Sequence, residues 1–220
     1  MSTGPGLRER KKQQTRERLV EIAWRLFAER GFDAVPVAEI AHEADVSEAT
    51  VFNYFPTKED LVYGRMEAFE EELLGAIRDR KPGESILAGF TRFVLEPRGH
   101  LTANDEQSAE SLLMFSRVIT NSPALIARER QVLDRYTRSL AALIAEDTGA
   151  AADDVTPWVA ANALIGVHRG LIDYLRRRVL AGVRNPRLAR GVRTQGEQAL
   201  ALLQHGLGGY GKKPKAARRS

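Results

Sequence analysis

Residues 36–61 read PVAEIAHEADVSEATVFNYFPTKEDL, with two short runs of periodic apolar residues on either side of a brief connection. In its first half, apolar side chains recur at steps of three and four residues, which places them on one face of a helix. They are Val37, Ile40, Ala41 and Ala44. Residues 44–46 form a short connection, and the hydroxyl of Ser47 suits the N-cap of a second helix that begins at Glu48. Two short helices joined so tightly predict a helix-turn-helix.

The expected second helix carries small or hydrogen-bonding side chains on its open face, so it can enter a major groove with its N-terminus first. The hydroxyls of Thr50 and Tyr54 can reach phosphates, and the Asn53 amide can reach a base edge. Pro56 ends this helix, and a Thr-x-x-Asp cap starts another that places Lys58 beside the groove. The alternative is a hairpin that serves packing alone. The expected DNA contacts are Ser47, Glu48, Ala49, Thr50, Asn53, Tyr54 and Lys58.

Four segments carry a resemblance to a known family. They are LFAERGF at 26–32, VAEIA at 37–41, VSEATVFNYF at 46–55 and KEDL at 58–61. In order and spacing they resemble the tetracycline-repressor (TetR) family of bacterial one-component regulators, over roughly residues 12–72. The resemblance implies an all-α fold, in which a three-helix DNA-binding domain precedes a larger helical domain for ligand binding and dimerisation.

Three positions depart from the family pattern. Val35-Pro36 stands where a Thr-Thr pair is usual, so a hydroxyl that would touch phosphate is absent. Asp45 replaces a common turn glycine, which is tolerable because aspartate enters the left-handed region more readily than most residues. Phe52 stands where tyrosine is commoner, and we expect its ring to join the core.

The positive charge of the chain is unevenly distributed. The 220 residues carry a formal net charge of +4, yet residues 1–63 hold 9 Lys/Arg against 11 Asp/Glu, a net of −2. Residues 1–18 hold six basic residues and two acidic ones, and residues 211–220 hold five and none. We therefore expect a flexible basic arm at 1–11 and a disordered basic tail at 206–220. Between them, the resemblance implies a DNA-binding domain at 12–72 and a regulatory domain at 73–205.

No pattern for catalysis or metal binding is present. The sequence has no cysteine, no Gly-x-Ser-x-Gly, no His-Glu-x-x-His and no P-loop, and its four histidines lie far apart. We expect no enzyme, no cofactor and no metal site. The N-terminus lacks the apolar core of a signal peptide, and the longest apolar run, 159–167, is far too short to cross a bilayer. We expect a cytoplasmic protein without a membrane partner.

The rest of the chain predicts helices at about 14–30, 57–80, 84–95, 105–120, 122–146, 153–180 and 186–203, and no strand. Residues 155–175 are apolar on nearly every side, so we expect this helix to be covered by its own core and by a second subunit. The expected interface of this homodimer is Trp158, Ile165, Gly166, Gly170, Val192 and Ala199.

Aromatic residues of the regulatory domain suggest a pocket for an apolar or aromatic effector, without the charge cluster that a strongly ionic effector would need. The expected lining is Phe69, Phe93, Met114, Phe115, Asn162 and His168. Two functions follow. In the first, a homodimeric repressor is released from a palindromic operator by this effector. In the alternative, the larger domain of a DNA-binding regulator only dimerises or binds a protein partner.

Overall fold

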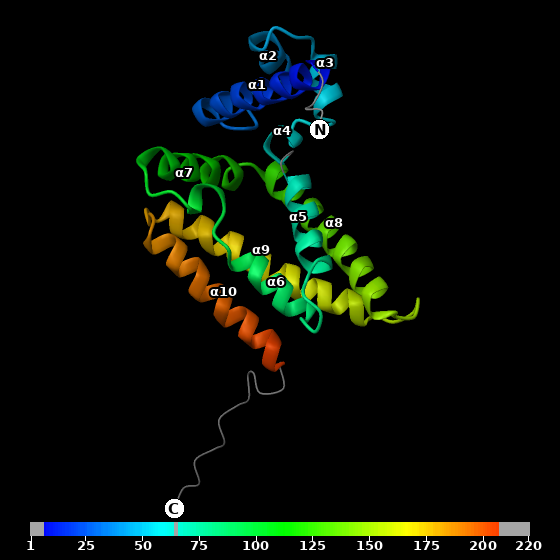
Figure 1. The fold of residues 1–220 in the computed structure, drawn as a ribbon. Coiled ribbons are helices and arrows are strands. Elements are labelled where there is room, and N and C mark those ends of the chain that lie inside the picture. Colours follow the sequence, from blue (N-terminus) through cyan, green and yellow to red (C-terminus); the bar gives the residue numbers. More distant parts are fainter. Residues whose placement is uncertain (1–6, 64–65, 207–220) are drawn as a thin grey trace, which may run out of the picture.

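The computed structural model describes residues 7–63 and 66–206, and every regular element within them is helical (Figure 1). The elements are α1 (Leu7–Arg30), α2 (Val37–Glu43), α3 (Glu48–Tyr54), α4 (Asp60–Tyr63), α5 (Met66–Arg78), α6 (Ile86–Leu95), the 3-10 turn η1 (Gly99–Leu101), α7 (Glu106–Thr120), α8 (Pro123–Thr148), α9 (Thr156–Leu180) and α10 (Arg187–His205). The DNA-binding unit comprises α1–α4, and the regulatory unit comprises α5–α10. The expected all-α fold with two helical parts is confirmed.

Local sequence signals place α2 and α3 as expected. Ser47 caps α3, because its Oγ accepts a hydrogen bond from the Thr50 N–H at 3.1 Å. Asp45 takes the left-handed conformation in the turn, with φ of 57°. Val51 and Phe55 bury the inner side of α3 in a core that is shared with α1, α2 and α4. The sequence therefore fixes both the start of α3 and the side that it buries.

The regulatory unit has its own core, centred on the long helices α8 and α9, which pack along each other. Tyr136 on α8 and Ala161 on α9 are fully buried there. Helix α10 closes this core, and its Gly196 is necessary for the close packing. A Cβ atom at Gly196 would lie 2.4 Å from Leu95 Cδ2 and 3.3 Å from Leu171 Cδ1. Leucine side chains from α6 and α9 therefore occupy the space that any larger residue at 196 would need.

The two units are joined by buried contacts at the end of α7 and the start of α8. Ile119 and Leu125 belong to the core of the DNA-binding unit. The buried Ser122 hydroxyl accepts from the Leu125 N–H at 3.4 Å and bonds to Asp33 Oδ1 at 2.8 Å. The Tyr63 hydroxyl donates to the Leu125 carbonyl at 3.1 Å. A displacement of α7 or α8 must therefore disturb the DNA-binding unit.

Two expectations about element bounds need correction. Helix α1 begins at Leu7, so residues 7–11, expected in a flexible arm, are helical, while residues 1–6 lie outside the described part. For the one helix expected over 57–80, α4 begins at Asp60 and α5 ends at Arg78, and residues 64–65 between them lie outside the described part. Gly206 caps α10, and the rest of the expected tail, 207–220, also lies outside it.

Candidate DNA-binding face and effector cavity

Helix α3 presents an open face that is suited to a groove. Ser47, Glu48, Ala49 and Asn53 are exposed there, as the sequence predicts. Thr50 is half-buried, and its hydroxyl lies 2.9 Å from that of Ser47. Tyr54 is also half-buried and packs against the core. The exposed side chains are the ones free to approach a base edge.

The position of Phe52 differs from the expectation that its ring joins the core. Its side chain is 45% exposed and lies on the open face of α3, and Val51 and Phe55 take the core positions instead. Because α3 has only two turns, one side is already filled by these two residues. An exposed ring here can contact sugars or a thymine methyl group.

Lys58 points towards its own domain in this structure. Its Nζ donates to the Phe32 carbonyl at 2.5 Å and lies 4.1 Å from the centre of the Phe32 ring. Burial lowers its pKa. The ammonium therefore links the turn before α4 to the loop after α1, and its role as a phosphate ligand remains a prediction that needs the side chain to turn outwards.

Acidic residues of α2 are neutralised by α1. Arg30 Nη2 bonds to Glu39 Oε2 at 2.5 Å, and Arg25 pairs with both Glu43 and Glu29. These pairs reduce the negative potential beside α3. Exposed basic residues at the start of α1 add positive charge to the DNA-binding unit: Arg10, Lys11 and Lys12.

A cavity of about 610 Å³ lies between the DNA-binding and regulatory units, and we call it the interdomain cavity. This volume falls within the range of small-molecule sites, roughly 300 to 1,000 Å³. Its walls come from α1, α4, α5, the turn after α6, α7, α8 and α9. The apolar lining residues are Val20, Trp24, Leu61, Val62, Phe69, Leu101, Leu112, Met114, Phe115, Ile119, Ile172 and Leu175. At the joint, Trp24 of α1 stacks on Phe115 of α7, with 5.0 Å between ring centres.

The cavity also has a polar wall. Arg176 Nη2 bonds to both carboxylate oxygens of Glu129, at 2.9 and 3.1 Å. Arg98 lies beside Phe93, with its guanidinium carbon 3.8 Å from the ring centre. Burial, and then the positive charge of Arg98, lowers the pKa of His168 to about 4. His168 is therefore neutral at pH 7. Burial also raises the pKa of Tyr63, so its hydroxyl keeps its proton.

Four of the six residues predicted for a pocket line this cavity: Phe69, Met114, Phe115 and His168. Phe93 does not line it, because it is buried behind Phe69 at a ring-centre distance of 5.2 Å. Asn162 is exposed on α9, and its amide donates to the Trp158 carbonyl of the same helix at 2.8 Å. The expectation that Asn162 and His168 share a cavity is therefore wrong.

Sequence reasoning missed two parts of the wall. The first is the DNA-binding unit itself, from which Val20 and Trp24 face the cavity. Both side chains are partly buried in the structure. The signal available in the sequence is that Trp24 lies beside the main apolar stripe of α1. The second is the set of charged residues, three arginines and Glu129, which corrects the expectation of a wall without a charge cluster.

The opposite side of α9 carries an exposed stripe. Trp158 is 48% exposed and Val159 is 60% exposed, and a Cβ atom at Gly166 or Gly170 would meet nothing within 4 Å. Ile165 is an exception among the predicted interface residues, since it is only 4% exposed and packs in the core of its own regulatory unit. Val192 and Ala199 on α10 are half-buried. The exposed stripe, with Val192 and Ala199 on the neighbouring helix, offers a face to a second copy.

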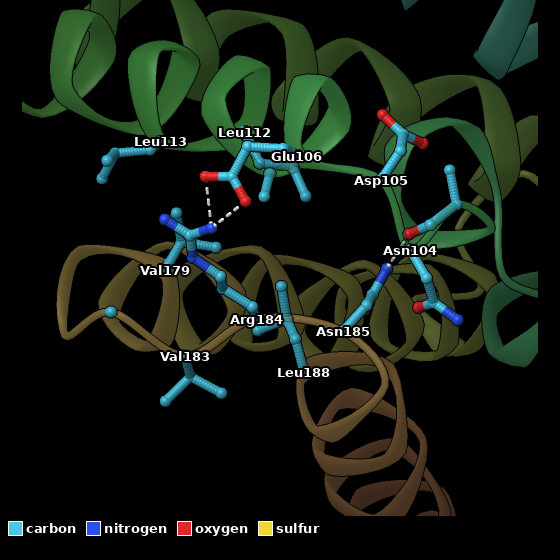
Figure 2. A pocket seen from close by; sticks show the side chains of 13 residues that line it. Asn104, Asp105, Glu106, Leu112, Leu113, Val179, Val183, Arg184, Asn185 and Leu188 are labelled. Atoms are coloured by element: carbon cyan, nitrogen blue, oxygen red, sulfur yellow. Dashed lines mark hydrogen bonds and ion pairs between the residues drawn. The ribbon is translucent and has the colours of Figure 1, made fainter.

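A smaller cavity of about 120 Å³ lies where the start of α7 meets the α9–α10 connection (Figure 2). An ion pair between Arg184 and Glu106 crosses it. The Asn185 amide donates to the carbonyls of Leu101 and Ala103, at 3.1 and 2.8 Å. Leu101 also lines the interdomain cavity, so these bonds fasten one of its walls to the α9–α10 connection.

Within the described ranges, no group of acidic or histidine residues is placed to hold a metal ion. No helix there is long and apolar enough to cross a membrane.

Comparisons with known proteins agree with this architecture. Residues 19–63 match the model described as "Bacterial regulatory proteins, tetR family", and residues 86–181 match the "MftR C-terminal domain". The chain is similar to the HTH-type transcriptional regulator TcmR of Streptomyces glaucescens, at 29% identity over 153 residues, which is 69% of this chain and 68% of that protein. The putative mycofactocin biosynthesis transcriptional regulator MftR of Mycobacterium tuberculosis is 24% identical over 165 residues, or 72% and 78%.

Among solved structures, NalD of Pseudomonas aeruginosa, the secondary repressor of the MexAB-OprM multidrug efflux pump, has the same fold. Its TM-score is 0.55 at 21% identity, and the match covers 88% of this chain and 97% of that one. The family models match the DNA-binding unit and much of the regulatory unit, and the relatives are named as transcriptional regulators. The chain therefore belongs to the TetR family, whose members are DNA-binding transcriptional regulators and not enzymes.

Proposed function

We propose that this regulator is a homodimeric repressor, and that a small molecule in the interdomain cavity releases it from a palindromic operator. The observation that carries the proposal is the shared wall of that cavity. Val20 and Trp24 come from the DNA-binding unit, whereas Met114 and Ile172 come from the regulatory unit. A ligand that touches both units has a direct means of changing their relative position.

Dimerisation is needed because one recognition helix reads only a few base pairs, and two half-sites are read by two such helices. The exposed stripe on α9 supports a twofold contact through Trp158, Val159 and Gly166. In an isolated subunit these apolar side chains are exposed to water, and a second copy of the same face would bury them. The interface would then fix the spacing of the two α3 helices.

Coupling follows from the packing at the joint. The Trp24–Phe115 stack and the Ser122–Asp33 hydrogen bond hold α7 and α8 against the DNA-binding unit. Packed contacts of this kind switch between arrangements instead of deforming continuously. A ligand that binds the non-DNA arrangement better by about 2 kcal/mol would lower operator affinity roughly thirtyfold.

The alternative is a regulatory unit that only dimerises or binds a protein partner. The cavity favours the effector mechanism, because dimerisation through the outer face of α9 requires no cavity of about 610 Å³ on the inner side.

The test begins by selecting operator DNA from a randomised duplex library with the purified protein. Small apolar and amphipathic compounds are then screened by thermal shift, and each stabilising compound is titrated into the protein–operator complex. Compounds that raise the melting temperature and also release the operator support the proposal. If every stabilising compound leaves operator affinity unchanged, the alternative is favoured.

A further inference from the structure

The charge of the interdomain cavity points to a class of ligand. Its wall contains Arg16, Arg98 and Arg176 but only one acid, Glu129, so the wall has a formal charge of +2. Glu129 is already bound through both oxygens to Arg176. The guanidinium of Arg98 also lies in this wall, beside a largely apolar space where an anion is favoured.

Arg98 is the arginine best placed to bind such an anion. One of its N–H groups donates to the Phe93 carbonyl at 2.5 Å, and another bonds to Glu96, whose side chain is 65% exposed and not part of the wall. A guanidinium has five N–H donors. Among the described residues, three of them have no hydrogen-bond partner, and the exposed Glu96 balances the charge only weakly because water screens it.

His168 provides a second polar group in the same wall. Its ring stacks on Phe69 with 4.9 Å between centres and 18° between planes, which fixes the plane in which its two nitrogens lie. Within the described part of the chain, neither nitrogen has a hydrogen-bond partner. A neutral imidazole offers one N–H donor and one acceptor. A half-buried donor without a protein partner is open to water or to a ligand in the cavity.

We propose that the effector is an amphipathic organic acid, with an apolar body against the aliphatic wall and one anionic group bound by Arg98 and the His168 N–H. The apolar body would contact Val20, Met114 and Ile172. This inference rests on the proposed function for its regulatory meaning, but the binding site stands on the geometry alone. It differs from the sequence-based expectation of an apolar or aromatic effector by adding an anionic group.

Two fluorescent probes separate charge from hydrophobicity. 8-Anilinonaphthalene-1-sulfonate and N-phenyl-1-naphthylamine share the same rings, and only the first carries an anion. The chain has two tryptophans, so Trp158→Phe leaves Trp24, in the cavity wall, as the sole energy donor to a bound probe. Binding in this background is followed by energy transfer from Trp24, which is most efficient for a probe in the cavity.

We expect the sulfonate to bind at least about tenfold more tightly than the neutral amine, as one charge-assisted hydrogen bond would give. Arg98→Met keeps much of the side-chain volume and should bring this ratio close to one. His168→Phe keeps the stack on Phe69 and should lower the ratio partly. Arg92→Met removes an exposed arginine of α6 that lies outside the cavity wall, and should leave the ratio unchanged.

Equal or tighter binding of the neutral probe would overturn the proposal, and so would a ratio that Arg98→Met leaves intact. The operator measurement separates this result from the function proposed above. A sulfonate that binds through Arg98 but does not release operator DNA would leave the acid site standing and remove the effector mechanism. Release by a neutral compound, with no preference for the acid, would support the effector mechanism and remove the acid site.

Discussion

His168 should make the stability of the protein depend on pH in a defined direction. Its pKa is about 4 in the folded protein, against an ordinary value of 6.5. Between these values the unfolded chain holds a proton on this residue that the folded protein lacks. Acidification from pH 7 towards pH 4 therefore favours unfolding. The stability that neutral His168 contributes at pH 7 is fully lost below about pH 4.

The size of the effect follows from the two pKa values. For one group whose pKa falls from 6.5 to about 4 on folding, the loss between pH 7 and pH 5 is about 2 kcal/mol. In a chain of this length, this corresponds to a fall in melting temperature of about 4 to 8 °C.

His168→Phe tests this reasoning, because phenylalanine can keep the stack on Phe69 and cannot titrate. Melting temperatures of the wild type and the variant are measured from pH 7 to pH 4 at one protein concentration, since dimerisation makes melting concentration-dependent. The other titrating groups are common to both proteins, so the difference between the two curves isolates His168. Parallel curves across this range would show that His168 is not held neutral in the cavity.

Three further predictions concern DNA reading, dimerisation and the cavity wall. Asn53→Ala should cost about 1 to 3 kcal/mol of operator affinity and relax preference at particular positions, measured by fluorescence anisotropy on single-base operator variants; a uniform loss over all sequences would contradict base reading. Gly166→Glu should give folded monomers with weak operator binding in analytical ultracentrifugation, because the position has free space in the subunit, whereas a stable dimer would remove α9 from the interface. Asn185→Ala removes the bonds to Leu101 and Ala103 and should increase amide hydrogen exchange around 98–103 while α3 keeps its protection; unchanged exchange there would show that Asn185 does not hold this wall.

The DNA-binding unit was largely predictable because its signals are local. The cap at Ser47 and the turn at Asp45 depend on residues a few positions away, and both are as expected. Phe52 was placed wrongly, because the position of α1 decides which face of α3 is buried.

The cavity was only partly predictable. Helix α9 is apolar on nearly every side, so its sequence does not show which face meets the core. Ile165 faces inwards and Asn162 outwards, the reverse of what their assignment to an interface and a pocket required. The charged wall forms from residues as distant as Arg16, Arg98 and Arg176, and only the folded chain brings them together.

The central claim is that filling the interdomain cavity weakens operator binding. Ile172→Trp places a larger ring in the cavity from the α9 wall, without any need to know the effector. The measurement is the operator dissociation constant of this variant against wild type, with ligand-free protein shown to be dimeric and folded. We expect roughly ten- to thirtyfold weaker operator binding, the effect of about 1.4 to 2 kcal/mol. A variant whose cavity no longer admits 8-anilinonaphthalene-1-sulfonate, yet which binds the operator as tightly as wild type, would contradict it.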